Sequence, residues 1–227
     1  VIKCLNLAHK IAMSNPIKGI INCPIDKRLL KKTGNFGVTE FLASKCKILK
    51  NSELMLIHNK KLSVAPITTH INLRNIATKI NKTLIVKKIQ TLNKEFKLKF
   101  GKKPRIALLG LNPHNSEFIK TSEEKKHIIP AIKILKKINI KISGPYASDT
   151  IFISDYKNYD VVVGMYHDQV LAPFKTLFKF DAINLTLGIN YVRVSPDHGT
   201  ATNLIGKNRA NFKSLQRCIK FINNLKK

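Results

Sequence analysis

The chain has 227 residues and is 44% hydrophobic, which is enough for a substantial core and excludes wholesale disorder. It carries 41 Lys and Arg against 13 Asp and Glu, but these cations are spread along the whole chain and aromatic residues make up only 7%. A nucleic-acid-binding module is therefore disfavoured, because such modules gather basic and aromatic side chains on one surface. The milder consequence of a formal charge of +28 is attraction for phosphorylated or carboxylated small molecules.

No apolar run approaches the roughly 20 residues that a membrane helix needs, and no secretory signal is recognisable. The four cysteines are scattered without a C-x-x-C pair, so neither a disulfide framework nor a structural zinc site is predicted. These features predict a cytoplasmic protein that does not enter a membrane. The chain opens at Val1 inside an apparent helix, which leads us to expect a missing N-terminal part.

Hydrophobic periodicity predicts alternating helices and strands. In chain order we expect a helix at 1–13, a strand at 17–23, helices at 25–32 and 39–45, strands at 53–57 and 62–67, helices at 73–80 and 83–100, a strand at 105–111, a helix at 121–135, strands at 140–143, 160–163, 182–187 and 191–195, and a helix at 212–225. Thr39 is interpreted as a helix N-cap and Thr121–Glu124 as a capping box.

This alternation predicts an α/β protein with a largely parallel sheet and helices on both faces. The strand pair at 53–67 adds an antiparallel or mixed part. Neither a G-x-G-x-x-G fingerprint nor a P-loop is present, so no common nucleotide-binding motif marks a cofactor site.

The polar segment Gly164–Lys175 directly follows a buried strand, Asp160–Val163. In an open α/β sheet, ligands bind beyond the carboxyl ends of the strands, so the segment is a candidate site. His167 followed by Asp168 could be a metal ligand beside an acid, or a general base beside its orienting carboxylate. The alternative is a solvated loop without a function.

Four of the seven histidines follow predicted strands, namely His70, His114, His167 and His198. If these strands are parallel neighbours, their ends converge on one edge of the sheet. Three neutral imidazoles with an open coordination position suit a divalent metal such as zinc. The alternative for each is a hydrogen-bonded loop residue. The remaining three, His9, His58 and His127, are predicted to lie on the surface.

Seven segments together carry a resemblance to a known family: Thr39–Phe41, Thr68–His70, Asn112–His114, Gly144–Thr150, Met165–Gln169, Asn184–Gly188 and Ser195–Thr200. In order and spacing the chain resembles the 4-hydroxythreonine-4-phosphate dehydrogenases of pyridoxal 5′-phosphate biosynthesis. The resemblance covers essentially the whole chain, 1–227, as a single family domain. It implies a three-layer α/β/α fold of the isocitrate/isopropylmalate-dehydrogenase-like type, with two lobes around a cleft, and a homodimer.

The resemblance also implies a reaction and its residues. Family members use NAD and a divalent metal (zinc, cobalt or magnesium) held by three histidines, which match His70, His114 and His167, one of them supplied across the dimer interface. Substrate contacts of the family match Thr39, Lys175, Asn184 and Arg193. Asp168 and Asp149 are candidates for a catalytic or ligand-orienting role, or are structural carboxylates. The reaction is oxidation of 4-phosphooxy-L-threonine at its secondary alcohol, followed by loss of carbon dioxide.

Three departures from the family pattern bear on this expectation. Val38 stands where the family has a substrate-contacting histidine, and Asn115–Lys120 replaces a glycine-rich loop after His114. Family chains also extend further at the N-terminus. A dehydrogenase of a related phosphorylated sugar acid, such as threonate or erythronate phosphate, and an inactive remnant of the family therefore remain alternatives.

Overall fold

The structure, a computed structural model, describes residues 1–14, 16–34, 37–48 and 51–225. Within these ranges the centre of the protein is one sheet of eight strands in the order β1-β8-β7-β2-β3-β6-β4-β5. The strands are β1 (Ile20–Ile21), β2 (Leu54–His58), β3 (Ser63–Pro66), β4 (Ile106–Leu109), β5 (Ile142–Tyr146), β6 (Val161–Gly164), β7 (Ile183–Leu187) and β8 (Arg193–Pro196). Each corresponds to one of the predicted strands.

The α-helices are α1 (Ile2–Ser14), α2 (Val38–Lys45), α3 (Ile76–Lys79), α4 (Lys82–Phe100), α5 (Ile129–Lys137), α6 (Ser148–Ile151), α7 (His167–Phe178) and α8 (Lys213–Asn224). Short 3-10 turns occur at Lys27–Thr33, Leu73–Asn75, Pro113–Phe118, Asp155–Asn158 and Thr202–Leu204, and a π-helical turn at Glu124–Ile128. Among the described residues no helix combines the length and apolar character needed to cross a lipid bilayer.

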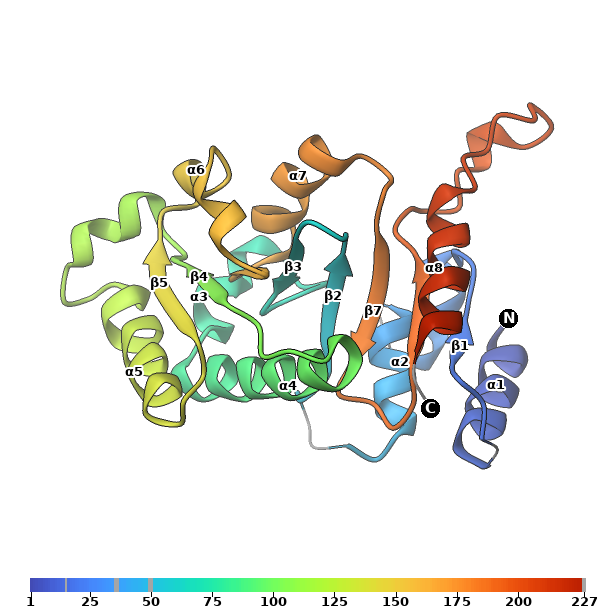
Figure 1. The fold of residues 1–227 in the computed structure, drawn as a ribbon, viewed down its shortest axis with the longest axis horizontal. Coiled ribbons are helices and arrows are strands. Elements are labelled where there is room, and N and C mark those ends of the chain that lie inside the picture. The colour runs from blue at the N-terminus through green and yellow to red at the C-terminus, as the bar shows by residue number, and fades with distance from the viewer. Residues whose placement is uncertain (15, 35–36, 49–50, 226–227) are drawn as a thin grey trace.

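The helices cover both faces of the sheet, which confirms the three-layer α/β/α prediction. Leu54 and Leu56 of β2 face α4, α5 and α8, while Met55 and Ile57 face α7. Both faces of the central strands are therefore buried, as their nearly continuous apolar runs indicate. In Figure 1, α5 lies at the end of the molecule opposite α1, and the segment between β8 and α8 extends outward beyond α8.

The sheet is mixed, and its strand directions correct one expectation. β3, β6, β4 and β5 are mutually parallel, so the chain leaves β3, β4 and β6 toward His70, His114 and His167 at the same edge. β3 to β2, β2 to β7 and β7 to β8 are each antiparallel, and three reversals point β8 the opposite way from β3. β8 therefore ends at the other edge of the sheet, so the four histidines do not share one edge, although His198 lines the same groove as His70 and His167.

Two predicted helix caps are wrong because each capping side chain forms its hydrogen bonds with residues elsewhere in the fold. α2 begins after Gly37, and the buried Thr39 hydroxyl instead hydrogen-bonds Thr186 at 3.3 Å. The Glu124 carboxylate accepts the backbone N–H groups of Leu111 and Asn112, at 2.8 and 2.9 Å, so it does not complete a capping box.

Helix α7 was not predicted as a helix. Its first turn is the polar segment that starts at His167, and Pro173 lies inside it. Proline removes a backbone donor, and the sequence signal was therefore that of a loop. The bland alternative of a solvated loop after β6 is also wrong, since Val170 and Phe174 of this helix are buried against the sheet.

His58 was predicted to lie on the surface, and this is also wrong. Its ring lies 4.5 Å from that of Phe100 and 6.3 Å from that of Phe221, and its Nδ1 is 2.8 Å from the Ser63 hydroxyl. Desolvation by these neighbours lowers the pKa of His58 to about 4. The folded protein therefore holds this imidazole neutral.

This buried imidazole predicts a measurable pH dependence of stability. The pKa of His58 is about 4 in the folded protein and near 6.5 in the unfolded chain. As the pH falls, the unfolded chain therefore binds the proton first, and the free energy of unfolding decreases below about pH 6.5. From about pH 7.5 to about pH 5 the free energy of unfolding should drop by roughly 2 kcal/mol through this group. Urea unfolding of His58→Phe over the same range should show a flatter slope; an unchanged slope would contradict the assignment.

Candidate active-site groove

A groove of about 400 Å³ crosses the face of β2, β7 and β8 that α2 and α7 cover. Six of the predicted site residues line it: Thr39, His70, His167, Lys175, Asn184 and Arg193. They come from α2, the segment after β3, both ends of α7 and two neighbouring strands. The fold thus assembles residues that are up to 154 positions apart in the chain, from Thr39 to Arg193.

At one end of the groove lie two imidazoles, each with a carboxylate behind it. The ring centroids of His70 and His167 are 5.9 Å apart. His70 Nδ1 is 3.0 Å from Glu40 Oε1, and His167 Nδ1 is 2.6 Å from Asp168 Oδ1. A carboxylate that holds Nδ1 fixes the ring and favours Nε2 as the coordinating atom, an arrangement typical of metal-ligating histidines.

Glu40 was missed by the sequence analysis. Burial alone would raise its pKa, but hydrogen bonds from His70 and Thr69 hold the pKa of Glu40 down to about 2, so it is a carboxylate at neutral pH. Gly37 makes room for it: a Cβ atom there would lie 2.5 Å from Glu40 Oε2 and 3.0 Å from His70 Cε1. The only sequence signal was the position of Glu40 directly after Thr39.

The middle of the groove holds a deeply buried cation. Arg193 is 3% exposed; its Nε donates to Asn22 Oδ1 at 2.6 Å and its Nη1 to Thr186 Oγ1 at 3.1 Å. Burial lowers the pKa of Arg193 to about 10, which leaves it charged at neutral pH. It forms no ion pair within the described ranges of the chain. A buried cation without a carboxylate partner favours an anionic ligand.

Asn184 and Lys175 also line this groove. The Asn184 Oδ1 atom is buried and has no hydrogen-bond partner among the described residues. At the far end, Lys175 Nζ contacts both the carbonyl oxygen and Oδ2 of Asp197, at 2.6 and 2.9 Å. Burial raises the pKa of Asp197, while the ammonium of Lys175 opposes this shift. An anion that binds Lys175 has to compete with Asp197, a residue without an assigned role in the sequence analysis.

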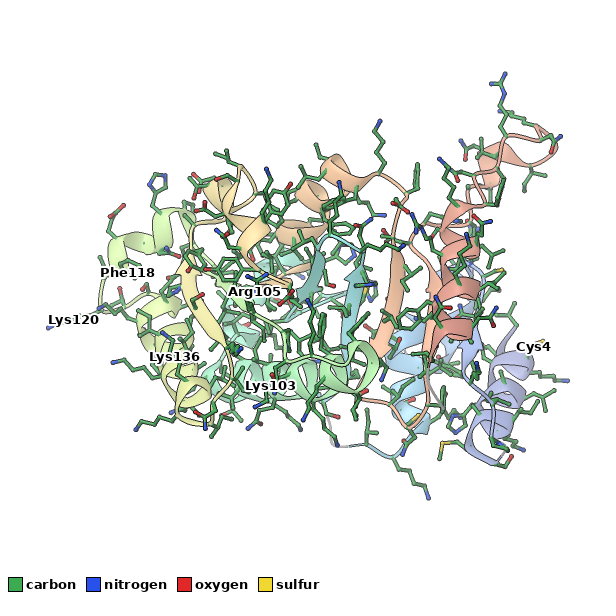
Figure 2. All side chains as sticks on the ribbon, viewed as in Figure 1. Cys4, Lys103, Arg105, Phe118, Lys120 and Lys136 are labelled. Atoms are coloured by element: carbon green, nitrogen blue, oxygen red, sulfur yellow. The ribbon has the colours of Figure 1, made fainter. Side chains whose placement is uncertain are left out.

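Three predicted residues are not among those that line the groove: Asp168, whose side chain is largely exposed beside His167, His114 and Asp149. His114 is exposed in the turn Pro113–Phe118, where residues 114–118 all have positive φ, from 45° to 56°. A positive φ is uncommon for non-glycine residues. These residues form the loop in which the family pattern has glycines and this chain does not. In Figure 2, Phe118 and Lys120 lie at the end of the molecule opposite Cys4. Asp149 is exposed on α6 and is not among the groove residues.

The described residues therefore contain two of the three predicted metal ligands side by side, but no cluster of three potential ligands. The two carboxylate-backed imidazoles fit a divalent metal in chemistry, and His114 remains a prediction.

Two buried side chains fix the strand ends that lead to this site. Gln169 Nε2 donates to the Gly110 carbonyl oxygen at 2.7 Å and to the Ser148 hydroxyl at 2.6 Å, and its Oε1 accepts the Met165 N–H at 2.6 Å. It thereby ties the ends of β4 and β6 together. Glu124 similarly holds the residues after β4, as described above.

These features define a three-layer α/β/α protein whose groove combines two carboxylate-backed histidines with a buried arginine. The sequence profile of the family described as "Pyridoxal phosphate biosynthetic protein PdxA" matches residues 1–222. The chain belongs to this family.

Individual relatives agree with this assignment. The chain is 42% identical over 210 residues to the 4-hydroxythreonine-4-phosphate dehydrogenase of Sulfurihydrogenibium sp., covering 91% of this chain and 64% of that protein. It is 42% identical over 217 residues to that of Aquifex aeolicus, covering 94% and 67%. A crystal structure of the Klebsiella pneumoniae protein of the same name matches with a TM-score of 0.81 at 31% identity, covering 97% of this chain and 67% of that one. The chain spans about two thirds of the length of these relatives.

Proposed function

We propose that the protein is a dehydrogenase that oxidises 4-phosphooxy-L-threonine in pyridoxal 5′-phosphate biosynthesis, with NAD as the hydride acceptor and a divalent metal (zinc, cobalt or magnesium). The observation that carries the proposal is the groove itself. It brings His70 and His167 together with the buried Arg193, which has no ion-pair partner among the described residues. The names of the relatives supply the substrate, and NAD is proposed from the family resemblance without assigned residues.

The chain's own residues bind and orient the substrate. Arg193 presents a fixed guanidinium to the carboxylate or phosphate of the substrate. Lys175 provides a second cation when the substrate anion replaces Asp197 as its partner. Thr39 and Asn184 supply a hydroxyl and an amide oxygen for hydrogen bonds. His70 and His167 would hold the metal, with Glu40 and Asp168 fixing their rings, and His114 of a second copy is proposed as the third ligand of a homodimer. The bound metal would make the substrate hydroxyl easier to deprotonate.

The chemistry balances in two steps. The C–H hydride of the secondary alcohol is transferred to NAD as the hydroxyl proton leaves, which gives 2-amino-3-oxo-4-phosphooxybutanoate. In this β-keto acid the bond to the carboxylate carbon then breaks, carbon dioxide leaves, the ketone accepts the electron pair as an enolate, and the former α-carbon takes up a proton from water to give the amino ketone phosphate. Asp168 and Asp149 are not needed as acid–base groups in this scheme; Asp168 acts through His167.

Metal content and NADH formation test the proposal. We expect about one metal per subunit in the wild type and its loss in His70→Ala and His167→Ala. His198→Ala is the matched control, because His198 lines the same groove at the opposite end and should retain the metal. Loss in His114→Ala would support the shared site. A folded wild-type chain that holds no metal and forms no NADH would reject the active-enzyme proposal in favour of a remnant.

Val38 favours a second candidate substrate, a phosphorylated sugar acid. Its apolar side chain lines the groove where the family pattern expects a substrate-contacting histidine. A phosphorylated sugar acid lacks the amino group of phosphohydroxythreonine. Parallel assays with 4-phosphothreonate or 4-phosphoerythronate would favour this alternative if their kcat/KM values are higher.

A further inference from the structure

A second hollow, of about 240 Å³, lies on the opposite face of the sheet from the groove, between the β2–β3 turn, the start of β7 and α8. Ile57 and Asn184 are paired across β2 and β7 and line the groove; the next pair, His58 and Ile183, lines the second hollow. Because adjacent strand residues point to opposite faces, the two spaces are back to back and separate. We refer to the second space as the α8 hollow.

One wall of the α8 hollow is aromatic. Phe221 supplies its hydrocarbon surface, while Ala182 and Ile183 form a nearly buried floor. The His58 ring adds a neutral aromatic face, since its pKa is about 4. Flat side chains of this kind pack well against a planar ring.

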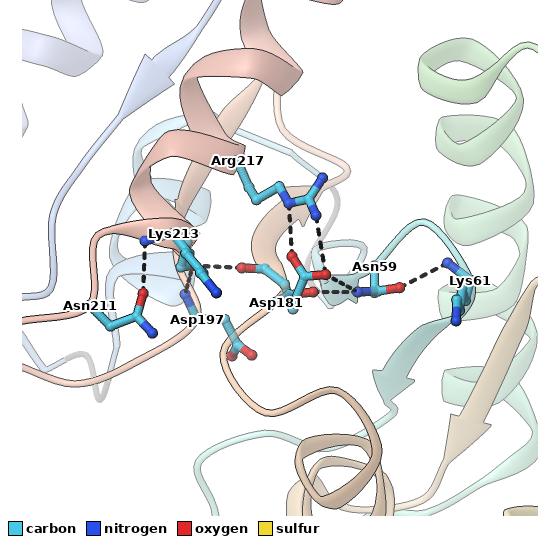
Figure 3. Close-up of polar contacts among 9 residues, drawn as sticks. Asn59, Lys61, Asp181, Asp197, Asn211, Lys213 and Arg217 are labelled. Atoms are coloured by element: carbon cyan, nitrogen blue, oxygen red, sulfur yellow. Dashed lines mark hydrogen bonds and ion pairs between the residues drawn. The ribbon is translucent and has the colours of Figure 1, made fainter.

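The rim of the α8 hollow is basic. Arg217 contacts Asp181 through two bonds, Nε to Oδ1 at 2.8 Å and Nη2 to Oδ2 at 3.2 Å, and Asn59 Nδ2 lies 3.3 Å from the same carboxylate. Figure 3 shows this arrangement, with Asp181 held between Arg217 and Asn59. The single carboxylate of the rim is thus already satisfied.

Two further cations complete the rim. Lys60 and Lys220 both line the hollow and form no ion pair within the described parts of the chain. With Arg217 and Asp181 cancelling, the hollow keeps two positive charges above the aromatic wall. Seven of the ten lining residues are polar or charged, so the hollow offers an aromatic surface beside groups that can bind an anion.

We propose that the α8 hollow binds a small planar anion, an aromatic or heteroaromatic ring that carries one carboxylate or phosphate. The ring would lie against Phe221 and His58, and the anionic group would face Lys220 and Lys60. The volume of about 240 Å³ is below the usual range of about 300–1,000 Å³ for ligand pockets, which favours a single small ring and excludes a dinucleotide. The proposal does not depend on the dehydrogenase function.

Equilibrium binding to the full chain at physiological salt tests this site. Pyridoxine 5′-phosphate is the ring phosphate, chosen because it has no aldehyde to react with lysines; benzoate is the ring carboxylate, and inorganic phosphate is the anion without a ring. We expect both ring anions to bind at least about tenfold more tightly than inorganic phosphate. Equal affinity for all three would overturn the planar-anion proposal.

Charge-reversal variants locate the binding. Lys220→Glu should weaken ring-anion binding by about tenfold or more, because it replaces a favourable charge contact by repulsion. Lys213→Glu is the matched control: Lys213 is exposed on the same helix and does not line the hollow, so a change below about twofold is expected. Equal losses in both variants would mean that the probe responds only to the overall charge of +28.

A third variant separates the two spaces. Arg193→Ala alters the groove on the other face and should leave ring-anion binding in the α8 hollow unchanged. If the probe binds normally to Lys220→Glu but not to Arg193→Ala, it occupies the groove, and the proposal of a second site is wrong. Binding of the probe to these variants can be measured whether or not the wild-type chain forms NADH, so a failure of the dehydrogenase proposal would not affect this test.

Discussion

With the proposed dehydrogenase activity, the kcat/KM for phosphohydroxythreonine should fall by roughly 10³-fold when Arg193 is replaced by alanine, which corresponds to about 4 kcal/mol. Arg193 is 3% exposed, and Asn22 and Thr186 fix its guanidinium at the centre of the groove. No described carboxylate neutralises it, so its charge is available to the anionic substrate. Removing it takes away the best-positioned cation of the site.

Arg193→Lys should be intermediate. A lysine keeps the charge, but one ammonium cannot reproduce the planar fork that reaches both Asn22 and Thr186. Arg209→Ala is the control, since Arg209 is exposed outside the groove and should behave as the wild type. Steady-state NADH formation would separate kcat from KM, and calorimetric binding of the substrate would replace it if turnover is slow. Near-wild-type binding and turnover in Arg193→Ala would show that Arg193 is only structural.

The strands were predictable because each is a short apolar run that glycine, proline or polar residues interrupt. Their directions were less accessible. Parallel order at β3, β6 and β4 follows from the intervening helices, whereas the reversal at β8 depends on the β7–β8 hairpin. As a result the sequence correctly placed His70 near His167, whereas His198 reaches the same groove from the opposite edge of the sheet and His114 does not line it.

Predictions about individual side chains failed where a distant partner competes with a local one. Thr39 is a plausible cap by local rules, but its hydroxyl contacts Thr186, 147 residues away. His58 follows a strand among lysines, and only packing against Phe100 and Phe221 shows why it is desolvated. Local propensity is outweighed by tertiary contacts at such positions.

The supporting residues of the site were missed for the same reason. Glu40 contacts His70 across 30 positions, and Asp197 contacts Lys175 across 22. A carboxylate in a sequence carries no sign of which cation or imidazole it will meet. The motifs therefore predicted six residues that line the groove, while the carboxylates that contact them could be identified only from the fold.

The largest loss of stability is expected for Gln169→Leu. Gln169 is 7% exposed, and its amide satisfies a backbone N–H at Met165, a backbone carbonyl at Gly110 and the Ser148 hydroxyl. Leucine is similar in size, so the change creates little cavity but leaves these groups without their partner. An unsatisfied buried polar group costs about 1–3 kcal/mol, and three of them should lower the free energy of unfolding by roughly 3–5 kcal/mol.

Urea unfolding of Gln169→Leu would measure this loss, with Gln90→Leu as the matched control. Gln90 is exposed on α4, so the same substitution there should change stability by no more than about 0.5 kcal/mol. Equal stabilities of the two variants would mean that the Gln169 contacts contribute nothing net.

The same variant connects the fold to the site. Gln169 holds the ends of β4 and β6 together, and these strands lead to His114 and His167. If His167 binds a metal together with His114 of a second copy, as proposed, Gln169→Leu should weaken metal binding by about 10- to 100-fold even under conditions where the chain is fully folded, because each chain then loses the contact that fixes both strand ends. Metal affinity that is unchanged in the folded variant would indicate that the helix α7 backbone alone positions His167, since its ring is already held by Asp168.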